Sequence, residues 1–380
     1  MNAPGGGQGA PDGGAAARHE AWARSARAIV VGCGGIGGCA AAALVDAGRS
    51  VVVVTGNPAI ARVVNEQGLA ARLPAGERTA RLRAVASAAE LPPGPYHLAL
   101  FAVPPNRLDE AAADVSPWLG DAGLFVPMTN GLPEERLAAR YGAGRVVGCI
   151  VGYGASMRAP GQVEQTSEGS LTLGRPDGSV DDGVGRTARF VEPIAPAVVT
   201  SNLRGARWSK LAINCAISAL GTLGGDRLGA LLRHRFIRRL CLEVMTEVTT
   251  VALRRGVSLE KIAGTVDLAW LALDENERAR AGSPGLVARH TVLLAVGMRY
   301  RRLRSSMLAA IERGREPPIE QLNGEVVARA RDAGLPVPVN EAVVAAVKAL
   351  ARREGTPSLE TLRALYDRTR AGPVRARPAA

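Results

Sequence analysis

The chain of 380 residues carries 47 basic and 35 acidic side chains, which gives a net charge of +12, and 47% of its residues are apolar and 3% aromatic. This composition excludes a wholly disordered chain, and the length predicts two domains that each bury a core. The positive charge does not indicate a nucleic-acid partner, because acidic residues accompany the arginines along the chain and few aromatic residues are present for base stacking. We expect an arginine-rich surface that favours small anionic ligands.

Two segments near the start of the chain bear on targeting. Residues 1–24 lack the basic start and the apolar run of a signal peptide, and we expect them to be a flexible tail. Residues 28–45 form the longest uncharged run, long enough to raise a membrane span, but five glycines lie in its middle and Asp46 follows at once. We therefore predict a strand, a glycine turn and a helix start here, and no membrane partner.

From residue 28 the pattern alternates strands with helices. An apolar strand at 29–31 precedes the glycine turn, a small-residue helix at 39–47 and a second strand at 51–54, which together form a βαβ unit. Strands that alternate with helices predict an α/β domain over residues 25–200, with a Rossmann-type, doubly wound parallel sheet. Further strand candidates are residues 97–103, 124–127 and 146–151.

The pattern changes again in the second half of the chain. Short extended pieces between residues 162 and 201 predict an antiparallel edge and a linker, and the long helical runs that follow predict an all-α domain over residues 201–370. The Pro-, Ala- and Arg-rich residues 371–380 predict a flexible tail. The extended pieces are residues 162–165, 170–173 and 197–200, and the helical runs are 206–223 and 226–255.

The glycine turn fits the GxGxxG pattern of a dinucleotide-binding loop, in the segment Gly32-Cys33-Gly34-Gly35-Ile36-Gly37. Gly32 would allow the tight turn, Gly34 would let a pyrophosphate approach the backbone, and Gly37 would let the helix lie close to the strand. The alternative is a turn that is merely rich in glycine. We favour cofactor binding by these six residues because the strand before them and the helix after them supply the context that the motif requires.

The residues after the second strand bear on the choice of cofactor. NAD-binding turns commonly place an acidic residue there to hold the ribose 2′-hydroxyl, whereas this chain continues Thr55-Gly56-Asn57. A carboxylate would repel a 2′-phosphate, so its absence predicts NADP(H), with Asn57 and Arg62 as candidate contacts.

Three polar residues at a regular spacing interrupt the nearly apolar helical run at 208–220. Lys210, Asn214 and Ser218 stand four residues apart, so on a helix they share one face, which must meet a polar cleft or a polar network. Lysine occurs at three positions in this arginine-rich chain. Burial can tune a lysine to act as a general acid, whereas an arginine does not release a proton near neutral pH. The alternative is a lysine that reaches solvent from a helix end, and we favour catalysis by Lys210.

Short motifs mark the chain over nearly its whole length. They are VVGCGGIGG at 30–38, NEQGL at 65–69, TNGL at 129–132, KLAIN at 210–214, SSML at 305–308, LNGE at 322–325 and GLPVPVN at 334–340. At these ordered landmarks the chain resembles the ketopantoate reductase (2-dehydropantoate 2-reductase) family. The resemblance implies a Rossmann domain, a helical domain and an active site in the cleft between them. It implies that Lys210 donates the proton, that Asn214 binds the substrate, and that Ser306 meets the substrate carboxylate.

Two further positions complete the candidate site. The resemblance places Asn130 where cofactor and substrate meet, and Asn130 also follows a strand at its carboxyl end, where ligands bind in open α/β sheets. We count Ala155, after the strand at 146–151, among the cofactor contacts, and Ser218 among the substrate contacts. No metal is required by this chemistry.

Several polar residues of the family are replaced in this chain. A family lysine is Pro104 here, a glutamate is Pro318, an aspartate is Ala310, and two asparagines fall at Ser218 and Leu228. We therefore predict NADPH-dependent reduction of a 2-oxo acid to a 2-hydroxy acid, with a side chain larger and more apolar than that of ketopantoate. The alternatives are a reductase or dehydrogenase of the same fold that acts on another carbonyl or an imine, and a non-catalytic dinucleotide-binding protein.

The five cysteines indicate the compartment. They are odd in number, lie in apolar contexts and form no CxxC pair, as expected of small buried residues in the reducing cytoplasm. As partners we expect a small 2-oxo acid, neither nucleic acid nor membrane, and we leave a homodimer open.

Overall fold

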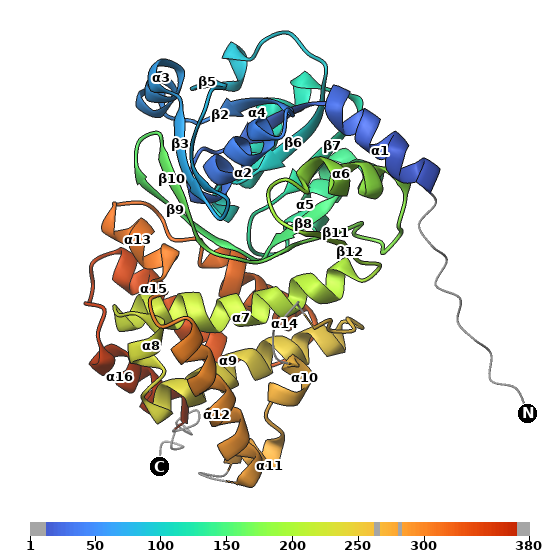
Figure 1. Ribbon diagram of the computed structural model, residues 1–380. Helices are drawn as coiled ribbons and strands as arrows, with labels where there is room; N and C mark the ends of the chain where they lie inside the picture. Colours follow the sequence, from blue (N-terminus) through green and yellow to red (C-terminus); the bar gives the residue numbers. More distant parts are fainter. Residues whose placement is uncertain (1–12, 262–266, 280–282, 371–380) are drawn as a thin grey trace, which may run out of the picture. The chain divides into compact units, whose positions relative to one another are not determined.

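The computed structural model describes residues 13–261, 267–279 and 283–370 (Figure 1). The chain divides into two compact units. Two short segments from the first half of the sequence belong to the second unit. The first unit contains the described residues up to Val103, together with Arg107–Thr129 and Glu134–Leu203. The second contains Pro104–Asn106, Asn130–Pro133 and the described residues from Arg204 onward.

The first unit is built on a five-stranded sheet in the order β5-β2-β1-β6-β7, in which every neighbouring pair is parallel. This order confirms the predicted Rossmann-type sheet. The strands are β5 (Arg83–Val85), β2 (Ser50–Val54), β1 (Arg27–Val31), β6 (Tyr96–Phe101) and β7 (Leu119–Pro127).

Both faces of this sheet are buried, as a doubly wound sheet requires. Alternate residues of β1 point to opposite faces: Ala28 and Val30 belong to one apolar core, and Ile29 and Val31 to another. The first core includes residues of α2 (Gly35–Asp46), and the second includes residues of α4 (Leu108–Val115) and α5 (Pro133–Tyr141). This packing explains the uninterrupted apolar run of β1.

Two smaller sheets complete the first unit. One has the order β4-β3-β10-β9 and the other β12-β11-β8. The predicted antiparallel edge is present in the pairs β9/β10 and β8/β11, although β10 also pairs with β3, and β11 with β12, in parallel. The strands are β3 (Leu69–Leu73), β4 (Gly76–Ala80), β8 (Gly148–Val151), β9 (Gly154–Ala159), β10 (Gln162–Ser167), β11 (Leu171–Gly174) and β12 (Ala197–Val199).

Helix α1 (Gly13–Ser25) corrects the prediction of a flexible tail over residues 1–24. It packs on α6 (Asp182–Val191), and its Glu20 carboxylate accepts hydrogen bonds from Arg49 at 2.9 Å and Arg189 at 2.7 Å. These guanidiniums, Arg49 foremost, hold the pKa of Glu20 down at about 2. The prediction failed because the partners of α1 lie far along the chain. Residues 1–12 lie outside the described residues, as do 371–380.

The second unit is helical, as predicted. Helix α9 (Arg235–Arg254) lies in its core, with most of its residues buried. The predicted run at 206–223 lies within α7 (Leu203–Gly224), whereas the run at 226–255 is divided into α8 (Leu228–Leu231) and α9. The other elements are α10 (Leu268–Leu271), α11 (Glu275–Ala279), α12 (Pro284–Arg299), α13 (Ser306–Glu312), the π-helical turn η5 (Glu320–Gly324), α14 (Glu325–Asp332), α15 (Pro338–Ala351) and α16 (Leu359–Arg370).

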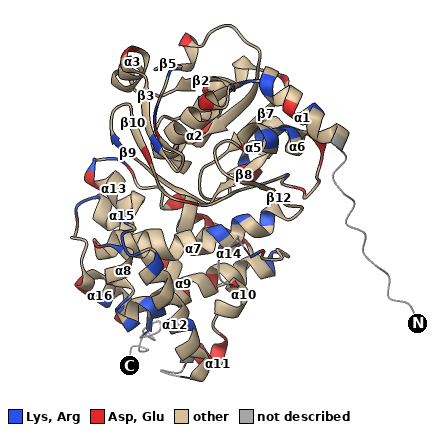
Figure 2. Ribbon diagram, in the orientation of Figure 1, with Lys and Arg blue, Asp and Glu red and all other residues tan. Residues whose placement is uncertain are grey.

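Charged side chains are distributed over both units. Figure 2 shows Lys and Arg interspersed with Asp and Glu on the helices of each unit. In the part of the chain that the structure describes, no helix has the length and apolar character needed to cross a bilayer.

Candidate active site

The glycine turn between β1 and α2 depends on the absence of side chains at two positions. Gly32 has a φ of +100°, its N–H donates to the Val54 carbonyl at 2.8 Å, and a Cβ on it would lie 2.8 Å from the oxygen of Ala102. A Cβ on Gly37 would lie 1.9 Å from the oxygen of Gly32. The turn and the close approach of α2 to β1 therefore require glycine at both positions.

Gly34 differs from these glycines because a Cβ there would meet no protein atom within 4 Å. It is the N-cap residue of α2, with a φ of −78° that any residue can adopt. The first hydrogen bond within the helix runs from the Gly38 N–H to the Gly34 carbonyl at 2.8 Å. Earlier N–H groups of the first turn lack an intrahelical partner and can bind an anion. The space beside Gly34 therefore fits a phosphate-bearing ligand.

The two non-glycine residues inside the motif contribute through their backbone. The Cys33 side chain is buried in the core of the first unit, where burial raises the pKa of its thiol to about 11. Ile36 packs against the same core, and its carbonyl accepts a hydrogen bond from the Tyr153 hydroxyl at 3.4 Å. The Cys33 side chain is therefore turned into the core, whereas that of Ile36 is half-buried.

Ala155 lies against the turn, as its assignment to the cofactor site requires. A Cβ on Gly35 would come within 2.6 Å of the Ala155 carbonyl carbon and 2.5 Å of the Ser156 nitrogen. Strand β9, which carries Ala155, is therefore packed directly on the first turn of α2. Its role in cofactor binding stays a prediction.

At the end of β2, Asn57 has a structural task. Its Oδ1 caps α3 (Pro58–Gln67) by accepting from the N–H groups of Ala59 at 2.9 Å and Ile60 at 3.4 Å. The Thr55 hydroxyl accepts from the Asn57 N–H at 2.9 Å and donates to its carbonyl at 2.7 Å. The side-chain NH₂ of Asn57 takes no part in this cap, and Arg62 is exposed on α3. Both residues stay candidates for the 2′-phosphate.

The NEQGL landmark joins α3 to the sheet. Asn65 Nδ2 donates to the Ala84 carbonyl at 2.7 Å, and its Oδ1 accepts from the Ala84 N–H at 2.9 Å. Gly68, with a φ of +85°, then ends α3. This landmark therefore supports the cofactor domain from outside the glycine turn.

On α7, Lys210, Asn214 and Ser218 share one helix face and are partly buried. Burial, followed by the nearby positive charge of Arg207, lowers the pKa of Lys210. The Asn214 Nδ2 is buried and has no hydrogen-bond partner among the described residues. A buried donor without a partner is costly, so this amide fits a site that a ligand completes.

The two serines of the SSML landmark do different things. The Ser305 hydroxyl donates to the Ser218 carbonyl at 2.8 Å, lies 2.8 Å from the Thr222 hydroxyl, and caps α13 by accepting from the Leu308 N–H at 3.4 Å. Ser306 follows with an exposed side chain. The structure thus joins the start of α13, which carries Ser306, to α7 at Ser218.

Asn130 is exposed and belongs to the second unit. The next residue, Gly131, has a φ of +91°, and a Cβ on it would lie 2.6 Å from the Gln321 carbonyl oxygen of η5. The Asn130 turn is therefore packed on η5.

Sequence reasoning missed Asn106 and Asn323. Each carries a buried Oδ1 with no hydrogen-bond partner among the described residues. For Asn106 the only signal was its position shortly after β6, at the carboxyl edge of the sheet. Asn323 was noted as part of a landmark, without a role. In the described ranges no group of three or more His, Cys, Asp or Glu could hold a metal ion.

Comparisons with known proteins agree with this architecture. The family model described as ketopantoate reductase PanE/ApbA matches residues 28–178, and the model of its C-terminal domain matches residues 202–351. A 2-dehydropantoate 2-reductase of Mesorhizobium japonicum is 28% identical over 348 residues, which cover 86% of this chain and 98% of the relative.

Two solved structures share the fold. A PanE/ApbA family ketopantoate reductase from Ralstonia eutropha aligns with a TM-score of 0.72 at 23% identity, covering 86% of this chain and 99% of that one. A D-mandelate dehydrogenase in a ternary structure with NADH and anilino(oxo)acetate aligns with a TM-score of 0.68 at 16% identity, covering 90% and 99%.

Proposed function

Because the chain belongs to the ketopantoate reductase family, we propose that it is an oxidoreductase that reduces a 2-oxo acid to a 2-hydroxy acid with NADPH. The observation that carries this proposal is the polar face of α7. It combines a partly buried lysine of lowered pKa with a buried amide donor one turn away. A general acid and a group that orients a carbonyl are the two functions that carbonyl reduction requires of a protein.

Lys210 acts as the general acid in this proposal. Reduced nicotinamide dinucleotide, when bound, would supply the hydride for C2 of the substrate and would leave as the oxidised cofactor. As the carbonyl π bond breaks, the oxygen takes up negative charge, and the Lys210 ammonium stabilises this charge and then transfers its proton to form the hydroxyl. The resulting neutral amine regains a proton from solvent. The lowered pKa makes the ammonium a stronger acid than an exposed lysine.

Four other side chains position the substrate. Asn214 Nδ2 donates to the substrate, and the Ser306 hydroxyl meets its carboxylate. Asn130 stands where cofactor and substrate meet. Ser218 adds a hydroxyl on the same face as Lys210 and Asn214.

The cofactor is held by backbone groups in this proposal. The N–H groups at the start of α2 bind the pyrophosphate, which occupies the open space beside Gly34. NADPH is preferred because no acidic residue follows β2 at Thr55-Gly56-Asn57, with Asn57 and Arg62 as contacts of the 2′-phosphate. The D-mandelate dehydrogenase structure contains NADH, which supports a nicotinamide dinucleotide as the cofactor class, and in this proposal the residues after β2 set the preference for NADPH.

The substrate has a larger apolar side chain than ketopantoate. Pro318 and Ala310 stand where the family has carboxylates, and Leu228, which is buried in the core of the second unit, stands where it has an asparagine. A site without these partners discriminates by shape more than by hydrogen bonding. The D-mandelate dehydrogenase structure holds anilino(oxo)acetate, an oxoacetate that carries an aryl amine on its oxo carbon.

A substrate panel tests the proposal. Purified protein is assayed with NADPH and with NADH against ketopantoate and against aliphatic, branched and aromatic 2-oxo acids, and oxidation of the cofactor is followed by its absorbance. We expect the highest kcat/KM with NADPH and a bulky apolar 2-oxo acid. Highest kcat/KM with ketopantoate would refute the proposed substrate class. Tight cofactor binding without turnover of any carbonyl compound would refute the proposed activity.

A further inference from the structure

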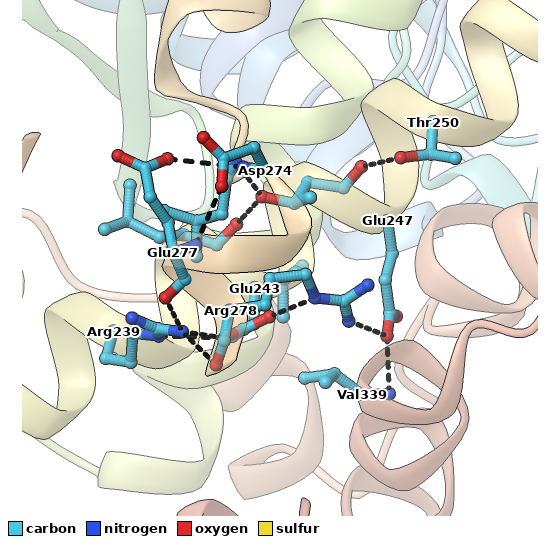
Figure 3. A network of polar contacts seen from close by, with 12 residues as sticks. Arg239, Glu243, Glu247, Thr250, Asp274, Glu277, Arg278 and Val339 are labelled. Atoms are coloured by element: carbon cyan, nitrogen blue, oxygen red, sulfur yellow. Dashed lines mark hydrogen bonds and ion pairs between the residues drawn. The ribbon is translucent and has the colours of Figure 1, made fainter. Parts of the chain in front are cut away.

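A chain of hydrogen bonds crosses the core of the second unit and ends beside Asn214. Figure 3 shows its first part, in which Glu243 and Glu247 of α9 lie on either side of Arg278. Arg278 Nε donates to Glu243 at 3.0 Å, and its Nη2 lies 3.7 Å from Glu247 Oε1. Arg239 pairs with Glu243 at 2.8 Å. Glu247 itself is only 2% exposed.

From Glu247 the network of hydrogen bonds continues through two asparagines that are fully buried. Asn340 Nδ2 donates to Glu247 Oε2 at 2.8 Å, and Asn323 Nδ2 donates to Asn340 Oδ1 at 2.9 Å. Asn323 Nδ2 also donates to the main-chain oxygen of Cys215 at 3.2 Å. Cys215 is the residue after Asn214 on α7. The network of hydrogen bonds therefore ends next to Asn214, whose amide is proposed to donate to the substrate.

The Glu247 carboxylate fixes the orientation of both asparagine amides. Glu247 accepts from the N–H groups of Val339 at 3.0 Å and Asn340 at 2.9 Å as well as from the Asn340 side chain. Burial raises the pKa of Glu247, but these donors and Arg278 oppose that effect by favouring the charged form. An acceptor at Glu247 directs Asn340 Nδ2 toward it, which leaves Asn340 Oδ1 to accept from Asn323 Nδ2. The same Asn323 NH₂ group also donates to the Cys215 carbonyl on α7.

The element that carries Asn323 contacts two candidate substrate segments. Asn323 lies in η5, a π-helical turn, and such turns recur at functional sites. Through Asn323 this turn holds α7 at Cys215, and through the Gln321 carbonyl it supports Gly131, next to Asn130. One short element therefore contacts both backbone segments, the residue after Asn214 on α7 and the residue after Asn130.

We propose that Asn323, oriented by Asn340 and Glu247, is a positioning residue that holds α7 against η5 so that Asn214 and Asn130 present their amides to one substrate. The kinetic part of this inference rests on the proposed function. The structural part does not rest on it, because the stability of α7 around Cys215 can be measured without a substrate.

The test compares two substitutions at Asn323 with a matched control at the far end of the same network. Asn323→Asp keeps the shape but removes both donors. Asn323→Ser is smaller and neutral, and covers the case in which a buried carboxylate prevents folding. Glu243→Gln weakens the contacts to Arg239 and Arg278 but leaves the chain from Glu247 to Cys215 intact. All three are expected to lower the melting temperature.

Hydrogen exchange of the full-length protein provides the first readout. We expect the peptide around Cys215 on α7 to exchange about tenfold faster in the Asn323 variants, as loss of one hydrogen bond there predicts, and at the parental rate in Glu243→Gln. Unchanged exchange in the Asn323 variants, or an equal increase in the control, would overturn the positioning role.

The second readout is kinetic. We expect the Asn323 variants to raise KM for the best 2-oxo acid about tenfold, with a smaller change in kcat and an unchanged Kd for NADPH, whereas Glu243→Gln keeps the parental KM. A merely structural role would lower the folded fraction in every variant and leave KM alone. If the parent protein turns over no 2-oxo acid, the proposed function fails, and the exchange experiment still decides whether Asn323 holds α7.

Discussion

The glycine turn of the first unit consists of main-chain groups, whereas the polar face of α7 in the second unit consists of side chains. In the proposed mechanism the turn acts through main-chain groups, and its shape depends on side chains being absent at Gly32 and Gly37. The α7 face is proposed to act through the side chains of Lys210 and Asn214, which are partly buried. An added Cβ therefore disturbs the turn where it meets protein atoms, as at Gly32 and Gly37, whereas the α7 face is sensitive to the chemistry of its side chains.

The largest effect is expected at Lys210, where the chemistry itself changes. Lys210→Ala should lower kcat by about 10²- to 10⁴-fold with little change in NADPH affinity, because the general acid is lost and the glycine turn is untouched. Steady-state kinetics with cofactor titration measures both. Lys210→Arg serves as the charge-matched control and should not restore the rate, because a guanidinium does not release a proton near neutral pH. An arginine variant of near-parental rate would disprove the proton-donor role.

Two alanine substitutions separate shape from ligand contact within the glycine turn. Gly37→Ala places a Cβ 1.9 Å from the Gly32 oxygen and should destabilise the first unit by about 1–3 kcal/mol or more, with loss of cofactor binding. Gly34→Ala meets no protein atom, so it should melt like the parent yet bind NADPH about tenfold more weakly, because the Cβ enters the space of the pyrophosphate.

Thermal melting with and without cofactor distinguishes these two variants. Parental affinity in Gly34→Ala would mean that no ligand approaches the turn there.

A smaller effect is expected at Asn57, where the backbone site meets a side chain. Asn57→Asp should shift the preference toward NADH by about tenfold in the ratio of kcat/KM values, because the carboxylate repels a 2′-phosphate. The fold should survive, since aspartate caps a helix as well as asparagine does. Asn57→Ser keeps a cap without charge and should keep the parental preference. If the parent shows equal kcat/KM with the two cofactors, the prediction of NADPH preference is wrong.

The smallest effect is expected outside both sites, at Glu20 of α1. Its pKa is lowered from 4.5 to about 2 in the folded protein, so its contribution to stability is present above about pH 4.5 and is lost as the pH falls toward 2. Glu20→Gln should lower the free energy of unfolding by about 1–2 kcal/mol at pH 7, after allowance for solvent screening. Denaturant unfolding should find parent and variant converging at low pH. A constant difference from pH 7 to pH 3 would contradict the assignment.

The sequence predicted the features that arise from local pattern. The glycines around the first turn, the apolar β1 and the four-residue spacing of Lys210, Asn214 and Ser218 follow from steric limits and helix periodicity, which act over a few residues. The same rules anticipated the parallel sheet and the helical second half.

Tertiary structure decided what depends on partners far apart in the sequence. Glu20 meets Arg189 across 169 positions, which turns an expected tail into helix α1. Asn323 meets Cys215 across 108 positions, and Asn340 meets Glu247 across 93. The contact of Ser305 with the Ser218 carbonyl likewise distinguishes this buried serine from the exposed Ser306. A local pattern shows that a polar residue is present, whereas the burial and hydrogen-bond partners that determine its role exist only once the chain has folded.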